Sequence, residues 1–221
     1  MLFGNGLSAL LTLMGISAVL VLLFIIGPLL ASGERPAPGW EGWLTYFGAL
    51  GAGFMLLEVA LLQRFVLLLG HPVYSLTVTL FSLLLGTGIG SLISRRIQPE
   101  RVKAVTVRAL LGVLAIAATS PLLLPPIIDT AIPWPLSVRV ALAAAILVPL
   151  GLLLGMPLPG GMRLLAAGRA DLVPWGWGIN GAFSVVGATL AVFIAMNWGF
   201  SATLLIGALI YGAAAQTLRS R

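Results

Sequence analysis

The sequence predicts an all-α membrane protein, a polytopic bundle of about seven transmembrane helices that forms one domain of 221 residues. Three observations support this prediction. The composition is 60% hydrophobic and only 8% charged, whereas a soluble domain carries about 25% charged residues. Apolar stretches of the roughly 20 residues that a helix needs to cross a bilayer recur along the chain. Trp, Pro and basic residues gather in the short segments between these stretches.

Seven apolar segments meet the length requirement for a membrane-crossing helix. The predicted spans cover about 7–30, 44–69, 73–94, 104–124, 138–158, 174–196 and 201–218. We expect loops at 32–42, 95–108 and 163–171, a proline stop at 125–126 and a tight turn at 197–199. A soluble catalytic domain of the usual ~100 to 150 residues has no room beside these spans.

The basic residues predict the orientation of the chain. The segments 95–108 and 163–171, together with the C-terminus, hold nine of the twelve Lys and Arg residues. Seven crossings place all three on one side, and the positive-inside rule makes that side the cytoplasm. We therefore expect a multi-pass protein of the cell (inner) membrane with its N-terminus outside. The net charge of +6 is explained by these helix ends, so no nucleic-acid partner is expected.

The composition argues against several classes of catalytic site. The chain has no cysteine and one histidine, His71. Disulfides, thiolate nucleophiles and metal sites built from several Cys or His residues are thereby excluded. We predict no catalytic residue, no metal and no cofactor for this chain, with the lipid bilayer as its solvent.

Small residues at four-residue spacing predict where the helices pack. Such stripes allow helix backbones to approach closely in lipid. The positions are Ser82, Gly86 and Gly90 in the third span, Gly151 and Gly155 in the fifth, and Gly187 in the sixth.

The segment 155–161 (GMPLPGG) is expected to be broken backbone rather than regular helix, because proline removes a hydrogen-bond donor and glycine is a poor helix former. Irregular backbone at membrane depth is tolerated only where it is buried in protein or lines a cavity. Two interpretations remain open: a helix end at the membrane interface, or a re-entrant segment that lines a ligand site.

Glu58 and Arg64 are charged residues that lie well inside the predicted span 44–69. An ionisable group there is a functional hypothesis by default. Six residues correspond to about 120° around a helix, so a partner for Glu58 is expected from another helix or from Arg64 bent back. Glu58 remains a candidate for an interhelical structural pair, for substrate or proton binding, or for an acid–base role. Arg64 is expected to reach toward the headgroups.

Three further polar residues complete the predicted substrate- or proton-binding set. Gln63 can bridge two helices, and His71 precedes a proline at a turn. For His71 we weigh a helix-end hydrogen bond against a proton shuttle. Asn180 near the start of the sixth span is expected to form an interhelical hydrogen bond, with a role in a cavity as the alternative.

Three segments together resemble a known family. Residues 51–94, 151–165 and 174–212 resemble the membrane half of bacterial spermidine synthase-like integral membrane proteins. In that family the membrane spans are joined to a Rossmann-like domain similar to spermidine synthases and S-adenosylmethionine-dependent methyltransferases. The matched positions are Glu58, Leu62 to Arg64, Gly70 to Pro72, and Asn180 with Gly181.

This chain departs from the family because it contains no strand–glycine-loop–helix unit. The resemblance therefore implies a membrane module that performs no aminopropyl or methyl transfer by itself. The chain is expected to be a fragment, a split-gene product or a freestanding module.

Three functions follow as hypotheses. The first is a membrane module that anchors or serves a soluble Rossmann-like, transferase-like domain or partner, supplying it with an amphipathic or polyamine-like cationic substrate. The second is a stand-alone transporter or permease for a small solute or cation that uses Glu58. The third is a structural subunit or homo-oligomer that docks through its small-residue stripes.

Overall fold

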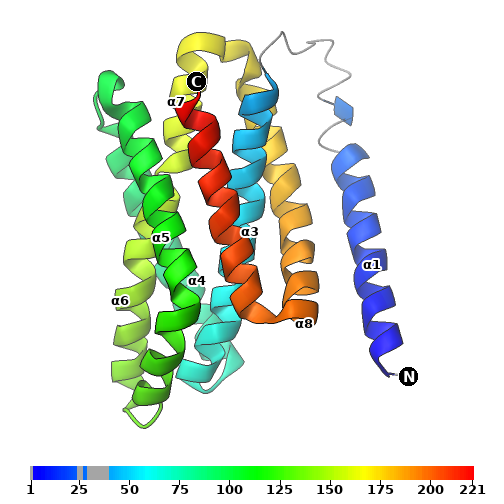
Figure 1. Cartoon of the computed structure of the whole chain (residues 1–221), viewed down its shortest axis with the longest axis vertical. Coiled ribbons are helices and arrows are strands. Elements are labelled where there is room, and N and C mark those ends of the chain that lie inside the picture. Colours follow the sequence, from blue (N-terminus) through cyan, green and yellow to red (C-terminus); the bar gives the residue numbers. More distant parts are fainter. Residues whose placement is uncertain (1, 24–26, 29–39) are drawn as a thin grey trace.

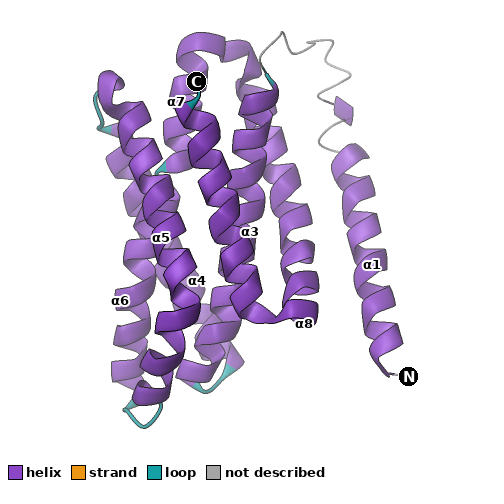
Figure 2. Cartoon of the chain, in the orientation of Figure 1, coloured by secondary structure: helices purple, strands orange, loops and turns teal. Residues whose placement is uncertain are grey.

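A computed structural model describes residues 2–23, 27–28 and 40–221, and the regular secondary structure of these residues is entirely helical (Figures 1 and 2). In chain order the elements are α1 (Leu2–Val21), α3 (Glu41–Leu69), α4 (Pro72–Arg95), α5 (Pro99–Ala131), α6 (Leu136–Gly155), α7 (Pro157–Arg169), the short 3-10 helix η2 (Ala170–Leu172) and α8 (Val173–Arg219). The predicted all-α class is confirmed. The end of the predicted first span and the stretch 32–39 lie outside the described residues.

Four helical stretches of the described chain are long and apolar enough to cross a membrane. They are Glu41–Leu69, Pro72–Arg95, Pro99–Ala131 and the run Leu136–Arg219, which contains α6, α7 and α8. The shorter apolar stretch Leu11–Val21 belongs to α1. Within α8, Gly199 has φ 81° and ψ 169°, a conformation that glycine adopts without steric cost. The helix turns back there into two antiparallel arms (Figure 1), and this turn falls within the predicted 197–199.

Helix α3 organises the bundle. It packs against both α8 and α4, while α4 packs against α6 and α5 packs against α8. The core around α3 is built from large, fully buried side chains, among them Tyr46, Phe47, Phe65 and Tyr211. Helix α1 stands beside the bundle and contacts α8 (Figure 1).

The outer surface of the bundle is apolar. Leu122, Leu209 and Phe81 are 77%, 69% and 66% exposed, and many neighbouring leucines are exposed as well. A soluble monomer rarely exposes large contiguous apolar patches, whereas this surface suits the hydrocarbon of a bilayer.

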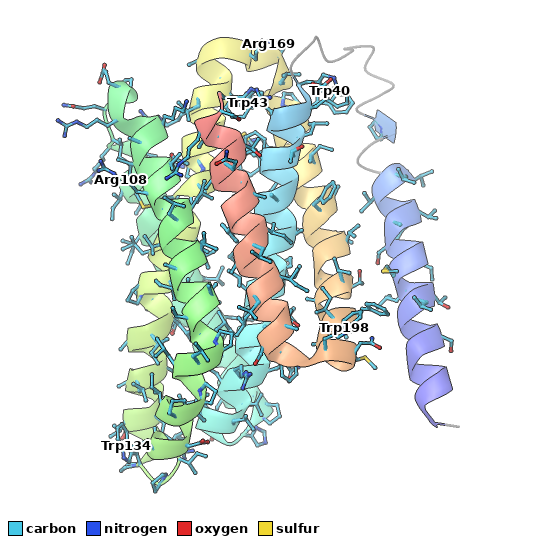
Figure 3. All side chains as sticks on the ribbon, viewed as in Figure 1. Trp40, Trp43, Arg108, Trp134, Arg169 and Trp198 are labelled. Atoms are coloured by element: carbon cyan, nitrogen blue, oxygen red, sulfur yellow. The ribbon has the colours of Figure 1, made fainter. Side chains whose placement is uncertain are left out.

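Aromatic and basic side chains mark the two ends of the bundle. Trp40, Trp43, Arg108 and Arg169 lie toward the end where the C-terminus is, and Trp134 lies toward the opposite end (Figure 3). Tryptophan is enriched at both interfaces of a membrane. The helix ends therefore have the chemistry of membrane–water boundaries.

Helix α5 corrects the proline stop expected at 125–126. The helix continues to Ala131 through Pro121, Pro125 and Pro126. Proline removes single backbone hydrogen bonds, but in apolar surroundings a continued helix satisfies the other peptide groups better than a loop does. The predicted span end at 124 is therefore too early by about two turns.

The loops expected at 95–108 and 163–171 are also largely wrong. Helix α5 begins at Pro99 and α7 continues to Arg169, so these basic segments are mostly helical. Proline fits the first turn of a helix, and Glu100 there complements the helix dipole. Hydropathy locates the apolar part of a helix, and polar turns at its ends escape that criterion.

The small-residue stripes of α4 and α6 lie face to face. A Cβ atom built on Gly86 would come within 2.9 Å of the Gly151 Cα, and one on Gly151 within 2.7 Å of the Leu83 carbonyl oxygen. A Cβ on Gly90 or Gly155 would overlap the backbone of the facing helix. Ser82, which was also predicted to pack, is buried on α4. These positions hold the two backbones in direct contact.

Helices α3 and α8 approach each other in the same way. A Cβ on Gly187 would lie 2.7 Å from the Ala52 Cα, and one on Gly51 would overlap the carbonyl oxygen of Asn180. The stripes at Gly86, Gly151 and Gly187 thus pack inside this chain. Because helices of the same chain already cover these glycines, the glycines do not support the hypothesis of a structural subunit that docks onto another protein through them.

Candidate functional site

The candidate site is built around the break between α6 and α7. Helix α6 ends at Gly155 and α7 begins at Pro157, so only Met156 separates them. The expectation of irregular backbone over 155–161 is therefore wrong for most of its length. Proline at the first helical position restarts the helix at once, because its missing N–H needs no partner there.

Neighbouring helices satisfy the peptide groups exposed by this break. The Tyr46 hydroxyl donates to the Pro157 carbonyl at 2.7 Å. The Met156 carbonyl accepts from the Gly160 N–H at 3.1 Å and from the Ser94 hydroxyl at 3.5 Å. Unpaired peptide groups cost several kcal/mol in an apolar interior. The break is therefore a built feature held by α3 and α4.

Glycines allow the broken segment to lie against the bundle. A Cβ on Gly160 would overlap the Thr106 hydroxyl, and one on Gly161 would overlap the Tyr46 ring. The glycines of the GMPLPGG motif thus serve close packing inside a helix, and its first proline marks the restart. The break is buried in protein, which is the condition for irregular backbone at membrane depth.

A pocket of about 420 Å³ lies beside this break, a volume within the ~300–1,000 Å³ typical of ligand sites. The lining residues are Leu50, Gly51 and Phe54 from α3, Leu84, Thr87, Gly88 and Ser91 from α4, Leu154 and Gly155 from α6, Leu158 and Pro159 from α7, and Asn180, Ser184 and Tyr211 from α8. Most of the lining comes from the second half of α4, the α6–α7 junction and the first part of α8, and these segments lie toward the end of the bundle where the C-terminus is (Figure 1).

Three polar groups of the lining already have partners. The Asn180 side-chain N–H donates to the Phe47 carbonyl at 3.1 Å. The Ser184 hydroxyl donates to the Asn180 carbonyl at 2.8 Å, and the Thr87 hydroxyl to the Leu84 carbonyl at 3.0 Å. These bonds fix the side chains and leave one Asn180 N–H and its side-chain oxygen to the pocket.

Tyr211 is the unusual member of the lining. Its side chain is only 1% exposed, and among the described residues its hydroxyl has no hydrogen-bond partner. The Tyr211 oxygen is not among the enclosed side-chain atoms of the described residues that lack a partner, so this hydroxyl keeps access to the pocket that the residue lines. The half-buried Ser91 hydroxyl likewise has no partner within the described chain. The pocket therefore presents free donors on an apolar wall.

Of the five polar residues predicted for a site, the structure brings one to this pocket. Asn180 lines it and also forms the expected interhelical bond. Glu58 is half-buried on α3, outside the lining, and has no hydrogen bond or ion pair within the described residues. Gln63 is exposed and borders a separate hollow with Pro72 and Ser75.

Arg64 and His71 lie toward the other end of α3 and have structural partners. The Arg64 guanidinium donates to the Ser201 hydroxyl on α8, and its Nε is buried without a partner in the described chain. It joins two helices instead of reaching toward headgroups. The His71 Nδ1 accepts from the Val73 N–H at 3.2 Å and caps α4, which agrees with a helix-end role.

Sequence reasoning missed Tyr46, Ser91 and Tyr211. Tyr46 and Tyr211 lie within apolar runs of the sequence. A buried tyrosine usually has a polar partner for its hydroxyl, so their positions could have indicated polar contacts inside the bundle. Nothing in the sequence marks which hydroxyl is used by the helix break and which is free.

The lining is apolar and carries only neutral polar side chains. Its side chains include no carboxylate, amine or imidazole. Across the described residues, no three His, Cys, Asp or Glu side chains come together to hold a metal ion. The pocket can hold a molecule through dispersion and hydrogen bonds.

No protein-family model, no curated protein and no solved structure matches this chain.

Proposed function

We propose that the chain is a seven-span membrane module of a spermidine synthase-like system and that it serves a soluble transferase-like domain or partner without catalysing a reaction itself. The crossings are α1, α3, α4, α5, α6 and the two arms of α8. The apolar outer surface and the tryptophans at both ends support this arrangement. The resemblance of residues 51–94, 151–165 and 174–212 to the membrane half of spermidine synthase-like proteins supports a soluble transferase-like domain as the partner.

The proposed orientation rests on the distribution of charge. The end of α4, the start of α5, helix α7 and the C-terminus meet at one end of the bundle (Figure 1). That end carries most of the basic residues, Arg95, Arg101, Arg169 and Arg219 among them. By the positive-inside rule it faces the cytoplasm, where a soluble transferase-like partner would be found.

The observation that carries the proposal is the pocket beside the α6–α7 break. It has the volume of a ligand site, has no carboxylate, amine or imidazole in its lining, and is lined mainly by segments near the basic end of the bundle. Such a pocket can hold a membrane-dissolved molecule near the surface where a soluble partner works. Its lining has no carboxylate, so the proposal no longer includes a polyamine-like cation as the molecule supplied.

A photo-crosslinking residue placed at Arg101 is expected to capture the partner in native membranes. Arg101 is exposed at the basic end, and Trp134 is exposed near the other end. We expect one stoichiometric adduct with a soluble Rossmann-like protein from position 101 and none from position 134, identified by mass spectrometry. Adducts only with copies of this chain, or the same adduct from both positions, would contradict the proposal.

A stand-alone transporter is the second candidate, because Glu58 is half-buried without a partner in the described chain. If the chain is a membrane module for a soluble partner, the Glu58→Gln variant should still form the crosslink from position 101. It should also unfold at the same temperature as the wild type or a higher one, because a neutral amide of similar shape costs less to bury than a carboxylate. Glu41→Gln, at the exposed start of α3, is the control. Proton flux into liposomes that Glu58→Gln alone abolishes would favour the transporter.

A further inference from the structure

We propose that the pocket beside the α6–α7 break binds an uncharged membrane lipid whose head group carries carbonyl oxygens, of which a prenyl quinone is the best-fitting example. The inference rests on the proposed function only in placing this bundle in a membrane. It assigns the chemical class of the molecule that the pocket holds.

The free hydrogen-bond donors of the lining select carbonyl oxygens. Tyr211, Ser91 and Asn180 each present a donor that no described residue uses. Ser91 belongs to α4, whereas Asn180 and Tyr211 belong to the two arms of α8. The donors therefore approach the pocket from different helices. A quinone ring bears two carbonyls that point in opposite directions and can accept from separate walls.

The remaining lining selects an uncharged, apolar molecule. It has no ionised side chain to balance a phosphate or an amine, and burying an unpaired charge is costly. The half-buried Phe54 offers aromatic surface on which a flat ring can stack. A charged lipid head group would have no counter-ion here.

The lining reaches the outer surface of the bundle at α4. Leu84 is 63% exposed, and Gly88, one turn further along, is exposed as well. A Cβ on Gly88 would meet no atom within 4 Å. In a bilayer this surface faces acyl chains, so a lipid can enter sideways and leave its tail among them.

A binding experiment on the full chain in lipid nanodiscs tests the inference. The probes are a photoreactive short-chain ubiquinone analogue and dioctanoylglycerol, an ester whose head also carries carbonyls. We expect saturable binding and a crosslink on α4 or α8 beside the pocket. Tyr211→Phe removes one hydroxyl and keeps the ring, so it is expected to weaken binding roughly fivefold, the effect of one neutral hydrogen bond.

Two further variants make the result decisive. Tyr74→Phe removes the hydroxyl of a tyrosine that is 51% exposed on α4, outside the pocket lining, and is expected to bind like the wild type. Gly88→Leu places a side chain at the pocket mouth, where there is space for it, and is expected to abolish binding while the unfolding temperature is maintained.

Each outcome has a defined meaning. Quinone binding weakened by Tyr211→Phe supports the inference, and dioctanoylglycerol binding with the same variant pattern supports it with an ester as the source of the carbonyls. Uptake of both probes that no variant changes is partition into lipid and overturns it, as does the absence of binding. The assay needs no partner protein, so failure here is distinct from failure of the Arg101 crosslink.

Discussion

Replacing Gly90 by alanine is expected to destabilise the protein by about 3 kcal/mol, at the upper end of the usual cost of overpacking. The added methyl group would overlap the carbonyl of Leu152 on α6, which is backbone and cannot rotate away. The two helices must separate along the interface that also contains Gly86 and Gly151. Close approach of small residues contributes much of helix association in lipid, so the loss spreads beyond one contact.

Gly88→Ala is the matched control for this prediction. Gly88 lies on the same helix, and a Cβ there meets no atom within 4 Å. Both substitutions gain about 1 kcal/mol in helix propensity, so the difference between them isolates the contact with α6. Thermal unfolding of the purified proteins should give a transition roughly 6–12 °C lower for Gly90→Ala and an unchanged or higher one for Gly88→Ala. Equal transitions would show that α4 and α6 do not meet at Gly90.

The sequence predicts the helical class and most helix positions because few solutions satisfy a backbone in an apolar solvent. Apolar length located the helices that became α3, α4 and α6, and the glycine at 199 turns α8 where the turn was expected. Spacing of small residues also identified which faces of α4 and α6 meet. These features depend on local chemistry, which a sequence displays directly.

Helix ends and prolines were predicted less well. Polar first turns such as Pro99 with Glu100 are helical although they are not apolar, and Pro125 with Pro126 lies inside α5. The GMPLPGG motif was expected to unwind, yet the helix is interrupted only at Met156. Whether a proline stops a helix depends on the peptide groups that neighbouring helices can satisfy, and this is tertiary information.

The candidate site was the least predictable part. Charge inside an apolar span directed attention to Glu58 and Arg64, which lie outside the pocket. The pocket depends instead on which hydroxyl remains free once the helix break has been satisfied. Tyr46 donates to Pro157, whereas Tyr211 has no partner among the described residues. Two tyrosines that look alike in the sequence therefore differ in role because of contacts more than 100 residues apart.

Arg163→Met is expected to destabilise the protein by about 2–3 kcal/mol, the scale of hydrogen bonds made by a charged group. The Arg163 guanidinium on α7 donates to the Ser94 carbonyl at 2.6 Å and to the Ile97 carbonyl at 2.8 Å. These carbonyls close the C-terminal end of α4, where the helix dipole also favours a positive charge. Methionine keeps most of the apolar stem and removes both donors.

Arg163→Met is expected to weaken ligand binding in the pocket as well as to lower the stability of the fold. Arg163 ties α7 to α4, and the two helices contribute Leu158 and Ser91 to the lining. We therefore expect Arg163→Met to lower the unfolding transition by roughly 4–12 °C and to weaken quinone binding in nanodiscs. Arg163→Lys should recover only part of both, because a lysine ammonium cannot donate as a planar fork to two carbonyls.

Arg169→Gln provides the control on the same helix. Arg169 pairs with the exposed carboxylate of Asp171 at 2.8 Å, and its hydrogen bond holds the pKa of that carboxyl below the usual value. An exposed pair of this kind contributes little to folding, so its loss should leave the transition and the binding unchanged. If Arg163→Met also behaved like the wild type in both assays, α7 would be held by its apolar face alone. The helix break would then owe its position to Tyr46 and the surrounding glycines, without the guanidinium clamp.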